Sequence, residues 1–559
     1  MSATRIYSPD LKIPSWVFLL ITAVYCCAFR VDIMDIDASQ YAEISREMAK
    51  SHNWLQVFDH GKDYLDKPPF LFWLSALSIR IFGASNFAYR LPSLLFALLA
   101  IYATYRLCRL LYNESTARIS ALVLATCQGL FLWTNDVRTD TILMSCVITA
   151  IWCIREAETA RRWYWVIGGT LAIACGMMTK GPIALFVPLF AFGSDWVLRR
   201  KWKLLFSPWH LLDAALIALF LIPMCIGLYQ QFDLHPEKLI DGHHHTSGLK
   251  FFFWTQSFGR ITGENSWNNG ADPFFLLSSM SWAFLPWILL FVTALFLNVR
   301  NLFQQRLRLV EGQEFLTTGG FLLTYLSLCI SKYQLPHYIL VAFPLAAIVT
   351  GKLIYDLISS GKLPKMGRIF SWIQSSISAL LMIGVLLILL IVFPAGPLAW
   401  IVYIIAIAVW AIVWIRNDQT KRILWVSGTT MILINIFLTN HFYYQLMKYQ
   451  CGSVMGKYLY QHHIPANTVM SWNAGDPLEC IHYYAKDTIE NRGDYPVPIR
   501  HQTYMLTQVK QLSSLDSIHQ AYSVLKKGRL FKVSELSPEF LNYKSRDQVT
   551  QEYCLIYLY

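Results

Sequence analysis

The stretch PLAWIVYIIAIAVWAIVWI, residues 397–415, contains no charged side chain. About 20 consecutive apolar residues form a helix long enough to cross the hydrocarbon core of a bilayer, so this stretch predicts a membrane-spanning helix. The whole chain has the same character, because 55% of its 559 residues are hydrophobic and only 15% are charged. Soluble domains contain roughly a quarter charged residues. The composition therefore predicts a polytopic membrane protein and excludes a disordered chain or a coiled coil.

Other apolar runs of this kind follow one another along the chain, and they predict thirteen spans in all. The predicted spans begin near residues 14, 86, 115, 141, 163, 182, 210, 273, 313, 336, 371, 397 and 423. Residues 70–82 are apolar but too few to cross a bilayer, contain Arg80 and follow two prolines. We expect them to form an interfacial or half-inserted helix.

The loop cations predict the orientation of these spans. Alternate loops are basic, and the net charge of +12 resides largely in them. Cytoplasmic loops of membrane proteins are enriched in Lys and Arg, so the alternation places the N-terminus in the cytoplasm and the C-terminus outside. Short basic loops between apolar runs fit anionic lipid headgroups, and nucleic acid is not an expected partner. The basic loops contain Arg106, Arg155, Arg199, Arg300, Lys362 and Arg416.

Three polar segments on the outer side are too long to be turns. Residues 31–69 and 231–272 are predicted outer loops of a membrane domain that covers residues 1–446. Residues 447–559 alternate short apolar patches with turn residues such as those at 473–477, so they predict a small α/β domain in the periplasm. The expected fold is thus an all-α membrane protein with a small α/β C-terminal domain.

Ionisable and aromatic side chains gather at the outer rim of this predicted bundle. Ionisable groups at the membrane are costly, which makes those outside cytoplasmic loops functional candidates. Carboxylates, cations and aromatic rings at one rim suit chemistry on an anionic, hydroxyl-rich substrate carried by a lipid. The candidates are Asp37, Tyr64, Asp66, Lys67, Arg138, Asp140, Lys180, Arg260, Lys332 and His337.

Single candidates also have structural interpretations. Asp37 and Gln40 have the spacing of a capping box at the start of an amphipathic helix over residues 38–50. Lys180 comes directly before Gly181-Pro182, a sequence typical of the end of one helix and the start of another. Lys67 could extend its ammonium to the membrane surface without a role in a site. Arg138 and Asp140 could form a local ion pair, and His243–His245 could lie in a solvated loop.

These motifs, taken in order, resemble a known family. The matching stretches are Asp37-Ala-Ser-Gln-Tyr-Ala-Glu-Ile-Ser-Arg-Glu-Met, Asp66-Lys67-Pro-Pro-Phe-Leu-Phe-Trp, Arg138-Thr-Asp140, Thr179-Lys180-Gly-Pro and Ser331-Lys332-Tyr-Gln-Leu-Pro-His337-Tyr. They resemble the bacterial lipid A aminoarabinose transferases, which belong with the protein O-mannosyltransferases to the GT-C superfamily. The resemblance implies a multi-pass inner-membrane enzyme that moves one sugar from a polyprenyl (undecaprenyl) phosphate carrier to an acceptor at the periplasmic face.

The resemblance also implies roles for single residues. Asp37 matches the family's catalytic carboxylate, and Asp140 corresponds loosely to a second acidic position. Lys67 and Arg260 match positions that hold the carrier phosphate. The other matching positions are assigned to substrate binding, and they are Tyr64, Asp66, Arg138, Lys180, Lys332 and His337. No cofactor is required by this chemistry, and a divalent metal ion is left open.

Two features depart from the family pattern, and other functions stay open. Asp66 stands where the family typically has Glu, and the triple histidine at His243–His245 lies outside the pattern. The expected acceptor is lipid A or a related lipid or glycan, with a protein acceptor as the alternative. A transporter of lipid-linked sugars would place its site near the bilayer midplane, often between internal repeats. A scaffold protein that uses the tail would leave the charged rim unexplained.

Overall fold

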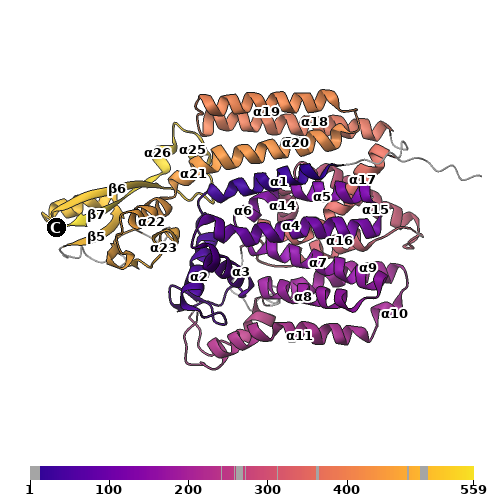
Figure 1. Ribbon diagram of the computed structural model, residues 1–559, viewed down its shortest axis with the longest axis horizontal. Helices are drawn as coiled ribbons and strands as arrows, with labels where there is room; N and C mark the ends of the chain where they lie inside the picture. Colours follow the sequence, from indigo (N-terminus) through magenta and orange to yellow (C-terminus); the bar gives the residue numbers. More distant parts are fainter. Residues whose placement is uncertain are drawn as a thin grey trace, which may run out of the picture.

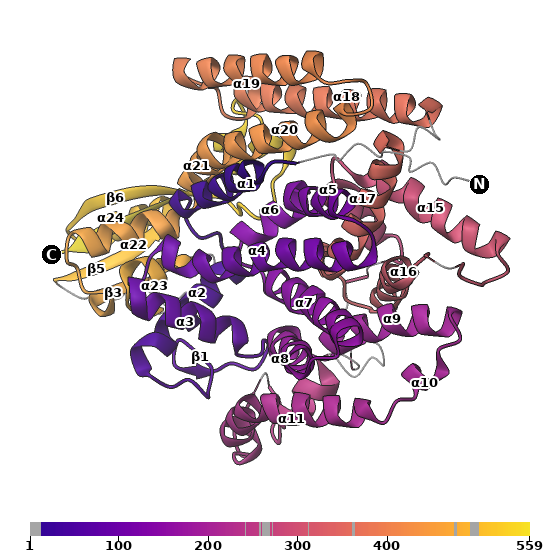
Figure 2. The same ribbon diagram turned by 45° about the vertical axis from the view of Figure 1, so that its right-hand side comes forward.

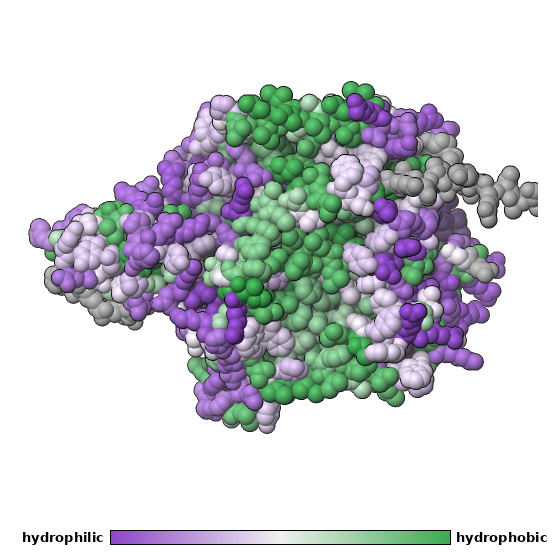
Figure 3. Space-filling model, in the orientation of Figure 1, coloured by the Kyte–Doolittle hydropathy of each residue, from purple (hydrophilic) through white to green (hydrophobic). Residues whose placement is uncertain are grey.

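The computed structural model describes residues 13–240, 242–256, 259, 269–270, 272–310, 312–359, 364–474, 478–491 and 502–559. Long helices lie side by side in a bundle, and the strands of the C-terminal region gather at one end of it (Figure 1). A broad hydrophobic band crosses the helices, and hydrophilic surfaces flank the band at both ends of the bundle (Figure 3). This distribution is that of a protein embedded in a bilayer.

An apolar helix begins close to each of the thirteen predicted starts. Among the described residues, six helices are long and apolar enough to cross a membrane, or seven if the pair α5–α6, bent by 53°, is one span. The protein is thus a mostly helical multi-pass membrane protein. The bounds are α1 Ser15–Cys27, α4 Asn86–Leu111, α5 Glu114–Thr126, α6 Gln128–Asn135, α7 Thr139–Ala160, α8 Trp163–Lys180, α9 Ile183–Leu198, α11 Trp209–Leu228, α14 Phe275–Ala283, α15 Ile288–Gln304, α16 Leu316–Cys329, η4 Pro336–Ala342, α17 Phe343–Ser359, α18 Pro364–Leu387, α19 Pro397–Arg416 and α20 Arg422–Phe437.

Burial separates the centre of this bundle from its periphery. The span formed by η4 and α17 has 89% of its apolar window buried inside the protein, whereas α19 has none buried. Helix α19, charged only at its terminal Arg416, lies at the edge of the bundle beside α18 and α20 (Figure 1). An apolar helix that leaves most of its surface outside the protein core is stable in lipid and unstable in water.

The first outer segment folds as helix, hairpin and helix. It comprises α2 Asp37–Ser51, β1 Phe58–Asp59, β2 Lys62–Asp63 and α3 Phe70–Phe82. Helix α3 has the bounds predicted from sequence; it begins directly after Pro69 and ends before Gly83, whose φ of +77° suits glycine. The predicted capping box is wrong. The N-cap of α2 is Ile36, no side chain among the described residues caps the helix, and Gln40 instead donates to Asp59 Oδ2 at 2.7 Å.

The C-terminal region contains a five-stranded mixed sheet with the order β4-β3-β5-β7-β6. Strand β3 is parallel to β4 and β5, whereas β7 is antiparallel to β5 and β6. Side chains on both faces of β7 are buried, because Tyr553 and Leu555 pack in one apolar cluster and Cys554 and Ile556 in another. The bounds are α22 Cys451–Gln461, β3 Val469–Ser471, α23 Cys480–Ala485, β4 Glu490–Asn491, β5 Thr503–Gln508, α24 Leu512–Ser517, β6 Tyr522–Leu530, α25 Pro538–Leu541, α26 Arg546–Val549 and β7 Gln551–Leu558.

Hydrogen bonds join this C-terminal region to the first outer segment. The Asp35 backbone N–H donates to Gln450 Oε1 at 2.9 Å, and the Cys480 N–H donates to Asp35 Oδ1 at 2.9 Å. Arg46 of α2 donates to the backbone carbonyl of Lys486 at 2.9 Å. Helices α2 and α23 contact each other, and they lie close together in both views (Figures 1 and 2). The C-terminal region thus holds the segment from which α2 begins.

Candidate functional site

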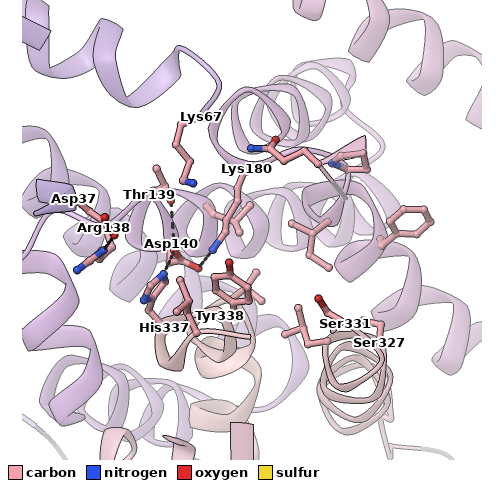
Figure 4. A pocket seen from close by; sticks show the side chains of 18 of the residues that line it. Asp37, Lys67, Arg138, Thr139, Asp140, Lys180, Ser327, Ser331, His337 and Tyr338 are labelled. Atoms are coloured by element: carbon pink, nitrogen blue, oxygen red, sulfur yellow. Dashed lines mark hydrogen bonds and ion pairs between the residues drawn. The ribbon is translucent and has the colours of Figure 1, made fainter. Parts of the chain in front are cut away.

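A cavity of about 280 Å³ opens beside the N-terminal end of α2, and residues from distant parts of the chain line it. The contributing elements are α2, the turn before α3, the start of α7, the junction of α8 and α9, the end of α16, and η4. Charged side chains are grouped around one side, and Ser327 and Ser331 lie on the other (Figure 4). The charged and imidazole side chains are those of Asp37, Lys67, Arg138, Asp140, Lys180 and His337.

Asp37 forms an ion pair with Arg138. Arg138 occupies the extended N-cap position of α7, and its guanidinium contacts both Asp37 Oδ2 and Asp136 Oδ2, the latter at 2.6 Å. The Asp37 side chain is still 47% exposed, so its carboxylate is accessible from the cavity. The predicted Arg138–Asp140 pair is wrong, because Arg138 turns toward α2 while Asp140 faces another cation.

That other cation is Lys180, at the C-terminal end of α8. Lys180 Nζ lies 2.6 Å from Asp140 Oδ1, and His337 Nε2 lies 3.6 Å from Asp140 Oδ2. The ammonium also lies 3.8 Å from the centre of the Tyr338 ring, a cation–π contact. The chain turns sharply at Gly181, with φ of +85°, and α9 starts at Ile183, as the sequence predicts. The Asp140 side chain is only 1% exposed, so it is a buried charge that depends on Lys180.

Lys67 reaches the cavity from the turn that precedes α3. Its ammonium pairs with Asp66 Oδ2 at 2.6 Å, and its side chain is 17% exposed. Gln256, from the second outer segment, donates to the Asp66 carbonyl and lines the same cavity. Tyr64 lies in a smaller adjoining cavity of about 20 Å³ that Lys67 and Gln256 also line. Burial raises the pKa of the Tyr64 hydroxyl well above its usual value, so this group stays protonated.

The remainder of the cavity wall is apolar. Phe186 and Phe190 of α9 stack with ring centres 6.1 Å apart, and Leu328 and Val341 contribute from α16 and η4. A cavity with charge on one side and apolar side chains on the other matches an amphiphile with an anionic head and a hydrocarbon chain. Small-molecule sites commonly combine an apolar lining with a few placed polar groups in this way.

The structure places the sequence-predicted candidates unevenly. Six of them line the cavity, Asp66 pairs with Lys67, and Tyr64 lies next door. Lys332 is exposed and is not among the lining residues, although its neighbour Ser331 is. Arg260 lies outside the described residues, and His243–His245 are exposed, as predicted for a solvated loop. Gln256 and Ser327 were not predicted, since nothing in their local sequence distinguishes them.

The chain is similar to a protein-family model, to named proteins and to solved structures. Residues 66–226 match a protein-family model described as dolichyl-phosphate-mannose-protein mannosyltransferase. The undecaprenyl phosphate-alpha-4-amino-4-deoxy-L-arabinose arabinosyl transferase of Edwardsiella ictaluri is 31% identical over 327 residues, covering 56% of this chain and 54% of that protein. The protein of the same name from Enterobacter sp. is 27% identical over 411 residues, covering 70% and 68%. The chain thus spans about half the length of the first relative and about two thirds of the second.

The fold has solved counterparts. ArnT from Cupriavidus metallidurans in the apo state superposes with a TM-score of 0.70, covering 97% of this chain and 98% of that one at 16% identity. The same protein bound to undecaprenyl phosphate gives a TM-score of 0.70 at 17% identity. Together with the family model and the named relatives, these matches bear out the predicted resemblance to the aminoarabinose transferases. At this level of identity, the structural likeness concerns the fold.

Proposed function

We propose that the protein is a glycosyltransferase that moves one sugar from undecaprenyl phosphate, or a related polyprenyl phosphate, to an acceptor. The observation that carries the proposal is the cavity, in which Asp37, Lys67 and Lys180 come together from three distant segments. Its mixture of paired charges and apolar wall suits a lipid-linked phosphosugar. The named relatives use such a donor, and one ArnT structure contains the carrier itself.

The cations of the cavity serve the leaving group in this proposal. When the glycosidic C–O bond breaks, the carrier phosphate gains negative charge, and positioned cations stabilise that charge. Lys67 is suited to this role because its side chain lines the cavity and, among the described residues, its ammonium pairs only with the partly exposed Asp66. Arg260, outside the described residues, is proposed as the second phosphate ligand on the strength of the family resemblance.

Asp37 is the proposed catalytic carboxylate. Its accessible carboxylate faces the cavity, and Arg138 contacts Oδ2 and so fixes the position of the carboxylate. For a hydroxyl acceptor, Asp37 would accept the proton as the oxygen attacks the anomeric carbon. For a phosphate acceptor, which is already ionised, Asp37 would orient the acceptor and stabilise positive charge on the sugar. Direct displacement of the carrier phosphate predicts inversion at the anomeric carbon and requires no metal ion.

Asp140 is proposed as a second acidic group that acts with Lys180 and His337. Its carboxylate is almost fully buried and contacts both partners, so it holds them in place on the cavity wall. His337 and Lys180 then present donors to the hydroxyl or amino groups of the sugar. Lys332, exposed beside the cavity, has no role in this scheme.

The topology of the proposal is that of an inner-membrane enzyme with thirteen spans and a cytoplasmic N-terminus. Residues 1–446 would form the membrane domain, and residues 447–559 would form the periplasmic domain. This division is supported by the position of the sheet at the same end of the bundle as α2 and α3 (Figure 1). The cavity would then open to the periplasmic side.

The proposed acceptor is lipid A, with another lipid, a glycan or a protein as alternatives. Purified protein incubated with a polyprenyl-phosphate sugar and each acceptor in turn tests this. We expect free polyprenyl phosphate to appear and the sugar to be recovered on lipid A. If the carrier is released only with another acceptor, that acceptor replaces lipid A in the proposal. If intact donor crosses a vesicle membrane without being cleaved, the protein is a transporter and not a glycosyltransferase.

A further inference from the structure

A second cluster of ionisable side chains lies where the first outer segment meets the C-terminal region. Asp59 ends β1, His60 is in the turn between β1 and β2, and Glu479 directly precedes α23. His60 Nδ1 lies 3.6 Å from Asp59 Oδ1, and His60 Nε2 lies 3.6 Å from Glu479 Oε1. One ligand atom from each of the three lies within 4.8 Å of the others. None of these residues is among the described residues that line the cavity.

The polar atoms that face each other in this cluster are buried without hydrogen bonds. Among the described residues, Asp59 Oδ1, His60 Nε2 and Glu479 Oε1 have no hydrogen-bond partner. Leaving a buried polar atom unsatisfied is unfavourable, and more so for a charged group. A cation between these residues would satisfy all three atoms.

We propose that Asp59, His60 and Glu479 bind a divalent transition-metal ion, specifically zinc. An imidazole nitrogen with two carboxylate oxygens suits zinc, whereas calcium and magnesium prefer oxygen ligands throughout. Zinc–nitrogen and zinc–oxygen bonds of about 2.1 Å in a tetrahedron place neighbouring ligand atoms about 3.4 Å apart. An imidazole binds an ion through one nitrogen, and the unsatisfied His60 Nε2 lies 3.6 Å from Glu479 Oε1, close to that value. One ligand atom from each residue lies within 4.8 Å of the others, so small side-chain shifts complete the tetrahedral spacing. Three protein ligands leave the fourth position to water.

The surroundings hold the three ligands in position. Gln40 Nε2 donates to Asp59 Oδ2 at 2.7 Å, which leaves Oδ1 for the ion. His60 and Gly61 have φ of +51° and +71°, so they close a tight two-residue turn that fixes the start of the imidazole side chain. The His482 ring lies 4.3 Å from the His60 ring, and its Nδ1 accepts a hydrogen bond from the Ile489 N–H. Supporting contacts of this kind orient metal ligands in proteins.

Bound zinc would fasten the C-terminal region to the outer segment that carries Asp37. The connection runs from Glu479 through the ion to Asp59 and then to Gln40, one helical turn after Asp37 on α2. The ion in this role is structural and touches no substrate. The inference stands independently of the proposed glycosyl transfer, because metal binding can be measured with no donor lipid present.

The test uses the purified full chain, stripped with a chelator and titrated with zinc chloride alone. We expect one zinc ion per chain by elemental analysis and an increase in melting temperature on zinc addition. Asp59→Asn and Glu479→Gln, each close in shape to the native residue, should weaken zinc binding at least tenfold. The matched control is the triple replacement of His243, His244 and His245 by alanine, which removes exposed histidines outside the cluster and should leave binding unchanged.

Cobalt substitution gives a second measurement that does not depend on the stability of the variants. A four-coordinate cobalt ion at this site should produce visible absorption bands that disappear in His60→Ala and persist in the triple-histidine control. Undiminished zinc affinity in both Asp59→Asn and Glu479→Gln would overturn the proposal. So would failure of the native chain to bind zinc, or loss of binding in the control in place of the cluster variants.

Discussion

The two sides of the cavity are built in different ways. The charged side brings together side chains from α2, the turn before α3, α7 and the end of α8, and each cation there contacts a carboxylate. The apolar side is formed by faces of α9, α16 and η4, elements of the bundle itself. In the proposed function, the charged side would perform the chemistry and the apolar side would hold the hydrocarbon chain.

The charged side itself contains two unlike ion pairs. The Asp37 side chain in the pair with Arg138 is 47% exposed, whereas the Asp140 side chain in the pair with Lys180 is 1% exposed. An accessible carboxylate can meet a substrate, and a buried one mainly fixes its neighbours. Variants on each side of the cavity, and in each pair, separate these contributions.

The largest effect is expected from Asp37→Asn. The amide keeps the size of the side chain but removes the base and the negative charge, so turnover should fall by about 10²–10⁴. Donor cleavage by purified protein measures it, and Asp487→Asn, an exposed carboxylate of the C-terminal region, serves as the matched control. Near-native turnover in Asp37→Asn, at equal protein level, would remove Asp37 from the catalytic role.

Lys180→Met is expected to lower the stability of the folded protein. It leaves the buried Asp140 without the ammonium that balances its charge, which typically costs about 3–5 kcal/mol. The melting temperature in detergent should therefore fall, and the double variant Lys180→Met/Asp140→Asn should recover most of the loss. If the single variant melts like the native protein, Asp140 does not depend on Lys180 for its charge balance.

Lys67→Ala should weaken capture of the carrier. A hydrogen bond to a charged group contributes about 1.5–3 kcal/mol, so affinity for polyprenyl phosphate should fall about 10- to 100-fold. Lys332→Ala removes an exposed cation from outside the cavity and is the matched control. Equal losses of carrier affinity in the two variants would point to general attraction of anions by the surface and against a phosphate site at Lys67.

The smallest effect is expected on the apolar side. Phe190→Ala removes a ring from the cavity wall and should lower affinity by about three- to tenfold, the range of about 1 kcal/mol of lost apolar contact. The loss should appear with long polyprenyl chains and vanish with short ones, whereas the loss in Lys67→Ala should not depend on chain length. Phe190→Leu is the control. A chain-length dependence in Lys67→Ala, and none in Phe190→Ala, would reverse the assignment of the two sides.

Sequence reasoning was effective where local patterns decide the structure. The apolar runs predicted helices close to where they occur, and α3 has the expected bounds because prolines precede it and a glycine follows it. The sequence motifs predicted that Asp37, Lys67 and Arg260 share one pocket; the cavity contains Asp37 and Lys67, and Arg260 lies outside the described residues.

Pairing between distant segments could not be predicted in the same way. The spacing of Asp37 and Gln40 satisfied a capping rule, yet each side chain found a partner on another segment. Arg138 and Asp140 are two residues apart on the sequence but face different partners, because one lies before α7 and the other within its first turn. The strand order of the C-terminal sheet and the meeting of His60 with Glu479 likewise depend on tertiary contacts that no local pattern records.

In the proposed enzyme, one cavity holds the carrier phosphate beside Asp37. A cryo-electron microscopy structure of the full chain with undecaprenyl phosphate bound measures this directly. We expect the phosphate within hydrogen-bond distance of Lys67 Nζ, the prenyl chain along Phe186 and Phe190, and the Asp37 carboxylate facing the space where the sugar would lie. A phosphate bound elsewhere, or one held in this cavity with Asp37 turned away from it, would overturn the proposed function.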